Sequence, residues 1–422
     1  MQECVRPTMP LIRPGVPGAQ TSPSARRTPS EFALLLLCAR LRTDAFAKTQ
    51  IEALLQEHID WDSLITAAHK HRVLPLVYLT LRGMAGIPDV AMSRLRNAVQ
   101  ANVRRNLFLT SELLRVIELF RKNGIPSIPY KGPAVASLVY GDVSLRQFAD
   151  LDVIVPSNSV VLAKALLVER GYRAEKPLSD DELAAFVATE KDITLLHDSL
   201  GINLEIHWGV VSDSDPIHVD PAFLWENLRT HTIAGRPVQT LRLEDLLLIL
   251  CIHGAKHRWE RLVWLCDVAE IVRTPGWVDW NVVLRNARRL GSGRILFLGL
   301  ALASDLLGAE LPPIVLRAIA ADSVLNALVT QVKGWLLSEQ TVPLDLGERE
   351  RYFMRLREHS ADRLRLAIKQ AKSYLALTVR DSEALSLPGF LEWSRYVVRP
   401  IRLAGQYGIT PFIRFFKGIF QS

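Results

Sequence analysis

The stretch ADLDVIV at residues 149–155 decides the fold of this 422-residue chain. Its β-branched residues and the proline that follows it predict a short strand. Alternate side chains of a strand face opposite ways, so Asp150 and Asp152 share one face while Leu151 and Val153 face a core. Two neighbouring carboxylates repel each other unless a cation lies between them, which favours a shared divalent metal. Taken alone, however, a D-x-D pattern is more typical of a solvent-exposed strand face.

A second strand strengthens the metal interpretation. The segments ITLLH (193–197) and INLEIHWGV (202–210) predict two strands joined by a hairpin loop at residues 198–201. Glu205 shares one face of the second strand with Asn203 and His207. If this strand lies beside the first, Glu205 joins Asp150 and Asp152, and the three carboxylates can hold Mg²⁺ or Mn²⁺. Glu205 is then either a metal ligand or the general base.

A phosphate-binding turn is predicted upstream of the carboxylates. Lys131-Gly132-Pro133 follows the apolar run IPSIPY and opens a helical stretch in which Pro133 is the first residue. Gly132 lets the backbone approach a phosphate, the helix N-terminus favours anions, and Lys131 adds a positive charge. The alternative is an ordinary turn with a solvated lysine. Arg146 either clamps a triphosphate or pairs with Asp142.

The wider chain divides into four predicted parts. Residues 1–27 are rich in Pro, Ser, Gly and Arg and predict a disordered tail. Residues 28–122 show helical periodicity, residues 123–240 follow a β-α-β-α-β-β order, and residues 241–422 are helical again. Within this last region, a Gly-Ser-Gly break at residues 291–293 separates two helices.

Read together, these residues resemble the DNA polymerase β-type nucleotidyltransferases, in which a Gly-containing turn opens a helix, a D-h-[DE]-h strand follows, and a neighbouring strand adds a carboxylate. The closer resemblance is to the bacterial family of uncharacterised nucleotidyltransferases, and it covers roughly residues 113–307. Three runs carry it: PYKGPAVASLVYGDVSLRQFADLDVIV, LEIHW and LCIHGAKHRWERLVWLCDVAEIV.

The resemblance implies an α+β fold, in which a small mixed-sheet, polymerase β-like nucleotidyltransferase domain is flanked by N-terminal and C-terminal helical regions. It also implies a divalent metal and a nucleoside triphosphate. The sequence departs from the superfamily pattern because Pro133 stands where a phosphate-binding serine is usual, so that contact is lost unless Ser137 or Ser144 replaces it.

A histidine-bearing segment lies in the C-terminal helical region. If residues 243–272 form one helix, His253, His257, Glu260, Trp264 and Asp267 fall on one stripe. The stripe is either a polar inter-domain face, a wall of the catalytic cleft, or the site of an H-x₃-H zinc pair. The glutamate of an H-E-x-x-H zinc motif is absent.

Composition limits the partners and the compartment. The 51 basic and 44 acidic residues give a net charge of +7, which is modest for this length and does not favour nucleic-acid binding. Four cysteines without a C-x-x-C pair predict a reduced, cytoplasmic protein, and no apolar run is long enough to predict a membrane span. After Glu392 the tail mixes basic and aromatic residues, which indicates a helix docked on its own core or, alternatively, a peripheral membrane or partner-binding helix.

The leading hypothesis is an enzyme that transfers a nucleoside monophosphate, AMP from ATP, to a hydroxyl or phosphate of a small molecule, sugar or protein. The alternative is a catalytically degenerate fold that binds a nucleotide or a protein. Transfer to RNA is disfavoured by the weak net charge. The residues expected to bind the nucleotide are Lys131, Gly132, Arg146, His207, His253 and His257.

Overall fold

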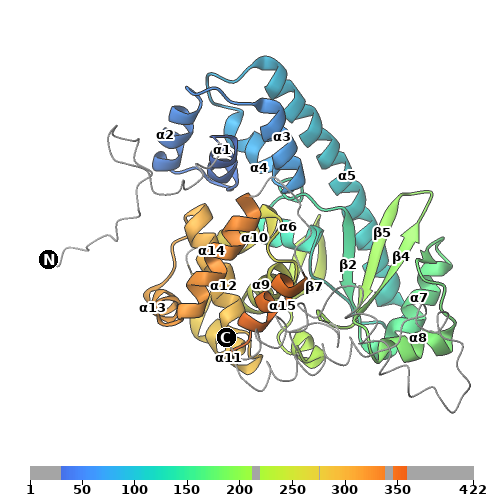
Figure 1. The fold of residues 1–422 in the computed structure, drawn as a ribbon. Helices are drawn as coiled ribbons and strands as arrows, with labels where there is room; N and C mark the ends of the chain where they lie inside the picture. Colours follow the sequence, from blue (N-terminus) through green and yellow to red (C-terminus); the bar gives the residue numbers. More distant parts are fainter. Residues whose placement is uncertain (1–29, 212–218, 275, 338–345, 359–422) are drawn as a thin grey trace, which may run out of the picture.

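The computed structural model describes residues 30–211, 219–274, 276–337 and 346–358. Figure 1 shows a small sheet with helices behind it and at its lower edge, beside a larger body of helices. The tails predicted at residues 1–27 and after Glu392 lie outside the described residues. The predicted domain boundaries stay predictions.

The sheet is mixed and contains five strands in the order β1-β2-β5-β4-β3. Strand β2 runs parallel to β5, and the other neighbours are antiparallel. The predicted strand at 149–155 and the predicted hairpin through residues 198–201 are confirmed. The bounds are β1 (Ile128–Pro129), β2 (Asp150–Ile154), β3 (Arg173–Ala174), β4 (Asp192–His197) and β5 (Ile202–His207).

One face of this sheet packs on helices and has its own hydrophobic core. Leu151, Val153, Leu204 and Ile206 are fully buried on that face. They pack with apolar residues of α5, α7 and α8, including Phe120. Because side chains alternate along each strand, the polar residues between these apolar ones must project from the opposite face. The helices of this part are α6 (Pro133–Tyr140), α7 (Val160–Val168) and α8 (Asp180–Val187), with short 3₁₀ turns η1 (Ser157–Ser159) and η2 (Pro221–Trp225).

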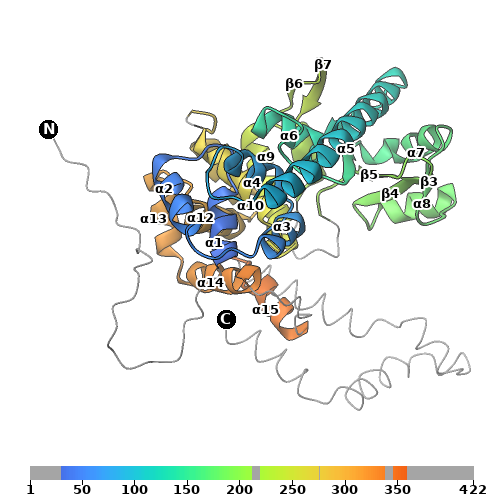
Figure 2. The same ribbon diagram turned by 90° about the horizontal axis from the view of Figure 1, so that it is seen from above.

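The remaining helices come from both ends of the chain and share a second core. Leu34 and Leu64 near the N-terminus belong to the same buried cluster as Leu248 and Leu300. The long helix α5 links these helices to the back of the sheet, as Figure 2 shows. The N-terminal helices are α1 (Ser30–Cys38), α2 (Ala45–Leu54), α3 (Trp61–Lys70), α4 (Leu74–Leu81) and α5 (Asp89–Lys122). The C-terminal helices are α9 (Leu243–Lys256), α10 (Leu262–Arg273), α11 (Trp280–Arg289), α12 (Gly293–Leu307), α13 (Pro313–Ala321), α14 (Ser323–Leu337) and α15 (Leu346–Arg355).

The single helix expected over residues 243–272 is wrong, because the chain turns between α9 and α10. Arg258 and Trp259 both have positive φ, at 55° and 57°. The fully buried Trp259 ring lies against Gly254 and Gly299, where an added Cβ would approach the ring to 2.3 Å and 2.9 Å. Burial of this indole between two glycines therefore stabilises a turn that helical periodicity does not indicate.

Strand β3, helix α8 and a second hairpin lie outside the β-α-β-α-β-β prediction. Helix α8 begins with a capping box, in which the Ser179 hydroxyl accepts from the Glu182 N–H and the Glu182 carboxylate accepts from the Ser179 N–H. A separate hairpin consists of β6 (Arg229–Ile233) and β7 (Arg236–Thr240). The break predicted at residues 291–293 is confirmed, since α11 ends at Arg289 and α12 begins at Gly293.

No single helix within the described ranges has the length and apolar character needed to cross a membrane. Helices α13 and α14 pass that test only as a pair, and they are bent by 94° relative to each other.

Candidate active site

The polar face of the sheet brings two of the predicted carboxylates side by side. In the parallel β2–β5 register, Asp152 lies opposite Glu205. Both side chains project from the face opposite Leu151 and Leu204, so the strand alternation places them as the sequence predicts. Asp152 is almost entirely buried and Glu205 is half-buried. Two carboxylates in this setting require a positive partner.

Lys131 supplies the positive partner, and His207 adds hydrogen bonds. The Lys131 Nζ lies 2.8 Å from the Asp152 Oδ1. The His207 Nε2 lies 3.1 Å from the Asp152 Oδ1 and 3.1 Å from the Glu205 Oε2. On its other side, the His207 Nδ1 lies 3.5 Å from the Asp192 Oδ2. The buried carboxylates are thus held by cationic and imidazole groups from two other positions in the chain.

A potential metal-binding group consists of Asp152, Glu205 and His207. One ligand atom from each lies within 4.8 Å of the others. Asp150, which we expected to be a third carboxylate ligand, lies outside this group. The charge of Asp152 nevertheless acts on the Asp150 carboxylate, because burial and then this charge raise the pKa of Asp150.

The pKa values of Asp152 and Glu205 are lowered, in contrast to that of Asp150. Burial would raise the pKa of Asp152, but the Lys131 ammonium and the His207 imidazole outweigh burial and hold that pKa below its usual range. Hydrogen bonding from His207 lowers the pKa of Glu205. In return, the Asp152 charge outweighs burial and raises the pKa of Lys131. The site is therefore built to keep Lys131 positive and Asp152 and Glu205 negative.

The turn at Gly132 packs directly on β2. Gly132 has φ +49°, and an added Cβ would lie 3.3 Å from the Asp150 carbonyl oxygen. Helix α6 begins at Pro133, as predicted. Glycine is thus required both by the backbone conformation and by the close approach. The turn directs Lys131 onto Asp152, and the Lys131 Nζ lies 4.7 Å from the centroid of the Tyr130 ring.

Arg146 does not pair with Asp142, which corrects one of its two predicted roles. Its Nε and Nη2 donate to the two Asp267 carboxylate oxygens at 2.9 Å and 2.8 Å. Tyr140 OH also donates to Asp267 Oδ1, at 2.9 Å. All three side chains are buried. The bidentate pair joins the loop before β2 to helix α10, so Arg146 borders the cavity with its charge already neutralised.

The histidines of the C-terminal region gather at the end of α9. The rings of His253 and His257 lie 4.6 Å apart, and both contact Trp264. These residues line the same cavity as the carboxylates. Burial, followed by the charge of Lys131, lowers the pKa of His253. In the described part of the chain, neither histidine belongs to a group of three potential metal ligands.

The cavity that collects these residues has a volume of about 360 Å³. The sheet supplies Asp150, Asp152 and Glu205, and the helical body supplies His253 and His257. Sequence reasoning missed several other lining residues, including Arg72, Tyr130, Asp192 and Arg261. Tyr130 ends the apolar run IPSIPY and Asp192 directly precedes the predicted strand at 193–197, so alternation could have found them. Arg72 and Arg261 lie at turns, where no local signal marks them.

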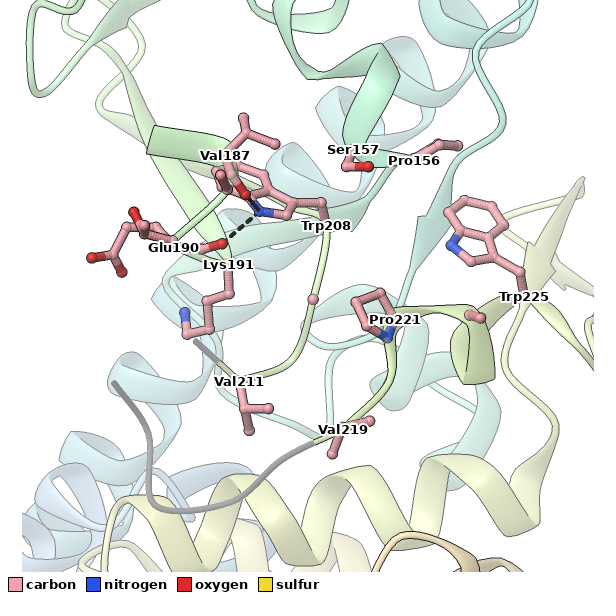
Figure 3. Close-up of a pocket in the computed structure, with 14 residues that line it drawn as sticks. Pro156, Ser157, Val187, Glu190, Lys191, Trp208, Val211, Val219, Pro221 and Trp225 are labelled. Carbon is pink, nitrogen blue, oxygen red and sulfur yellow. Dashed lines mark hydrogen bonds between the residues drawn. The ribbon is translucent and has the colours of Figure 1, made fainter. Parts of the chain in front are cut away.

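A second cavity of about 390 Å³ opens beyond the end of β5. Figure 3 shows two indoles, Trp208 and Trp225, on its walls, with Pro156 and Pro221 between them. The Trp208 indole N–H donates to the backbone oxygens of residues 187 and 190, which leaves only its ring to contact a ligand. Lys191 borders both cavities.

The two serines considered as phosphate ligands point elsewhere. Ser137 Oγ lies 2.9 Å from the His231 Nε2 on the β6–β7 hairpin. The Ser144 N–H donates to Asp142 Oδ1, and neither serine lines the cavity. The hydroxyl that Pro133 removes is therefore not replaced from these positions.

Comparison with known proteins identifies the family. The model of the family described as "Uncharacterised nucleotidyltransferase" matches residues 57–308, which is more than half of the chain. Among solved structures, the chain is similar to the solution structure of the antibiotic-resistance factor ANT(2'')-Ia, at 13% identity and a TM-score of 0.27, over 51% of this chain and 95% of that one. A TM-score that low supports no correspondence between residues. No curated protein matches. The matched segment contains every residue of the carboxylate cluster described above, and the chain belongs to the uncharacterised nucleotidyltransferase family.

Proposed function

We propose that this nucleotidyltransferase transfers AMP from ATP to a hydroxyl or phosphate of a small molecule, a sugar or a protein. The observation that carries the proposal is the pairing of Asp152 with Glu205 in one cavity, with Lys131 held 2.8 Å from Asp152. The two carboxylates can bind a divalent cation, and the Lys131 ammonium can bind the phosphates of a nucleotide that the cation coordinates.

The donor atoms fit a divalent ion. Mg²⁺ prefers carboxylate oxygens together with water and phosphate, and Asp152 and Glu205 offer such oxygens within 4.8 Å of each other. Mn²⁺ also accepts an imidazole nitrogen, which His207 offers in the same group. Asp150 is proposed to add a further carboxylate from the same strand face. A bound divalent ion supplies charge neutralisation at the phosphates and lowers the pKa of an attacking hydroxyl.

The chain's own groups orient the reactants. Lys131 attracts the phosphates, and the backbone at Gly132 allows them to approach α6 closely. In the reaction, the acceptor oxygen forms a bond to the α-phosphorus while the bond between this phosphorus and the β-bridging oxygen breaks. The acceptor proton passes to a carboxylate of the cleft, and pyrophosphate leaves. His253 and His257 are proposed to line the nucleotide side of the cavity.

The proposed acceptor is not a nucleic acid, because the net charge of +7 is small for a chain of 422 residues. We also propose a cytoplasmic location. The cysteines within the described ranges, Cys38, Cys251 and Cys266, are free and buried, as expected in a reducing compartment.

The experiment compares two labels of ATP in a transfer assay with a cell extract as the source of acceptor. Label on the α-phosphate should appear on an acceptor in the presence of Mg²⁺, and label on the γ-phosphate should not. The Glu205→Gln variant should lose this transfer. The matched control is Asp181→Asn, which removes an exposed carboxylate on α8.

Other outcomes decide against transfer. Incorporation of γ-label would indicate phosphoryl transfer instead. If ATP binds equally well with and without Mg²⁺, and Glu205→Gln leaves its affinity unchanged, the protein is a nucleotide-binding module. The absence of a serine hydroxyl at position 133 is the observation that keeps this alternative open.

A further inference from the structure

Arg72 lies in a strained turn that other parts of the molecule hold in place. It has φ +58° between α3 and α4, a conformation that is unfavourable for a residue with a Cβ. The N–H groups of Leu262 and Val263, at the start of α10, donate to the Nδ1 and the carbonyl oxygen of His71, at 3.4 Å and 3.2 Å. The Leu74 N–H donates to Gln147 Oε1 at 3.0 Å. The turn is thus fixed from both sides.

This turn directs a guanidinium into the catalytic cavity. Arg72 lines the cavity together with Asp150 and Asp152. Within residues 30–211, 219–274, 276–337 and 346–358, its side chain makes no hydrogen bond and no ion pair. Burial and the charge of Arg261 lower the pKa of Arg72, while the Asp150 charge opposes them. A strained backbone and a partly desolvated charge both cost stability, which indicates a role in binding.

Arg261 lies beside it at the N-cap of α10. Its guanidinium lies 5.6 Å from the centroid of the Trp264 ring, and it makes no ion pair in the part of the chain that the structure describes. Arg72 and Arg261 are therefore two like charges at one wall of a cavity. Their mutual repulsion is relieved when an anion lies between them.

Three other cations of the cavity already pair with carboxylates. Lys131 pairs with Asp152, Arg146 with Asp267, and Lys191 with Asp192. Arg72 and Arg261 on the helical wall are therefore able to accept a new anionic partner, in addition to the phosphate contact proposed for Lys131. A guanidinium donates in a planar fork that matches two oxygens of a phosphate.

We propose that Arg72 and Arg261 form a subsite for the β- and γ-phosphates of the nucleotide, and so for the pyrophosphate that leaves. This assignment rests on the proposed function, which requires the α-phosphate at the carboxylates of the sheet wall. The opposite, helical wall then faces the terminal phosphates, which carry most of the nucleotide's negative charge. The N-terminal helices thus take part in binding the leaving group.

The test measures the affinity of the full chain for three probes by calorimetry: inorganic pyrophosphate in EDTA, ATP with Mg²⁺, and AMP. The Arg72→Gln and Arg261→Gln variants should each weaken pyrophosphate and ATP about ten- to a hundredfold, as expected for a lost hydrogen bond to a charged group. AMP affinity should stay within about twofold, because AMP does not reach this subsite. Arg72→Lys should recover part of the loss. Arg104→Gln, at an exposed position on α5, is the matched control.

A structural role for Arg72 predicts a different pattern. If Arg72 stabilised the fold, Arg72→Gln would lower the melting temperature without ligand. The subsite predicts an unchanged or higher melting temperature, because the substitution removes repulsion from Arg261. Equal pyrophosphate affinities in Arg72→Gln and Arg104→Gln would overturn the proposal, as would an equal loss for AMP.

The two proposals fail in distinguishable ways. If the wild-type chain transfers AMP but binds pyrophosphate independently of Arg72, only the subsite is wrong. If it transfers nothing, yet pyrophosphate binding depends on Arg72 and Arg261, the anion subsite stands and the proposed reaction does not.

Discussion

The two walls of the proposed catalytic cavity are built in different ways. The sheet wall carries Asp152 and Glu205 on adjacent strands whose other face packs on its own core. The helical wall carries Arg72, in the turn between α3 and α4, and Arg261, at the N-cap of α10. Alternation along a strand is a local property, whereas each of these turns depends on contacts between segments that are distant in sequence. The carboxylates of the sheet wall are therefore fixed by local pattern, and the two guanidiniums of the helical wall by tertiary packing.

This difference predicts that substitutions on the two walls have different consequences. A change of charge on the sheet wall should abolish the reaction and leave the register of the strands unchanged. A change in the packing of the helical wall should lower stability and disturb ligand binding together. The following predictions test this contrast.

The largest effect is expected for Asp152→Asn on the sheet wall. Metal-ion catalysis contributes several kcal/mol, so loss of this carboxylate should slow transfer by more than about 1,000-fold. The substitution is nearly isosteric, and the strand should keep its register. Steady-state rates of α-label transfer measure the effect, and urea denaturation checks that the variant is folded. Activity within about tenfold of wild type would show that Asp152 is not central to the reaction.

The next effect is expected for Trp259→Ala in the helical body. The ring is fully buried against Gly254 and Gly299, so its removal leaves a large cavity. The free energy of unfolding should fall by about 3–5 kcal/mol, as for other buried aromatic side chains. Urea denaturation measures it, with Trp277→Ala as the control, since that side chain is 43% exposed. Equal losses in the two variants would contradict the packing described for the turn between α9 and α10.

A smaller effect concerns the pH dependence of stability near the Arg72 turn. Burial, with the charges of Lys70 and Arg261, lowers the pKa of His71 to about 4 from 6.5. The folded state therefore keeps this ring neutral while the unfolded state takes up a proton, so stability is fully present above pH 6.5 and is lost as the pH falls toward 4. The loss should reach about 3 kcal/mol. His71→Asn keeps an acceptor for the Leu262 N–H but does not titrate. The stability of the wild type relative to the variant should fall by about 3 kcal/mol from pH 7 to below pH 4, and a constant difference over this range would contradict the prediction.

The smallest effect is expected for Ser137→Ala. Its hydroxyl contacts His231 and does not line the catalytic cavity. Transfer rates and ATP affinity should stay within about twofold of wild type, since no phosphate contact is lost. A larger loss of ATP affinity would place this serine at the phosphates and would restore the contact that Pro133 removes.

The sequence predicts the sheet side of the molecule well. The D-x-D strand, the hairpin through residues 198–201 and the helix start at Pro133 all follow from period-two patterns, turn residues and proline geometry. These signals act within a few residues. Together with the hypothesis that the two strands are adjacent, they suffice to place Asp152 beside Glu205.

The sequence does not predict the helical wall, for a physical reason. Residues 243–272 keep helical periodicity through the turn at Trp259, and only the contacts with Gly254 and Gly299 favour the break. Likewise, nothing local marks Arg72, because its turn is held by hydrogen bonds to α10 and Gln147. The local sequence offers Asp142 as one partner for Arg146, whereas the observed partner, Asp267, lies far away in sequence and accepts from the Arg146 Nε and Nη2. Long-range contacts decide all three.

The most direct test of the central claim is titration of Mn²⁺ into the full chain, followed by electron paramagnetic resonance. The claim is that the paired carboxylates of the sheet wall hold a divalent ion. The wild type and Asp181→Asn should bind Mn²⁺ equally, and more tightly when ATP is present, while Asp152→Asn should show no such site. Equal Mn²⁺ binding by the wild type and Asp152→Asn would contradict the claim.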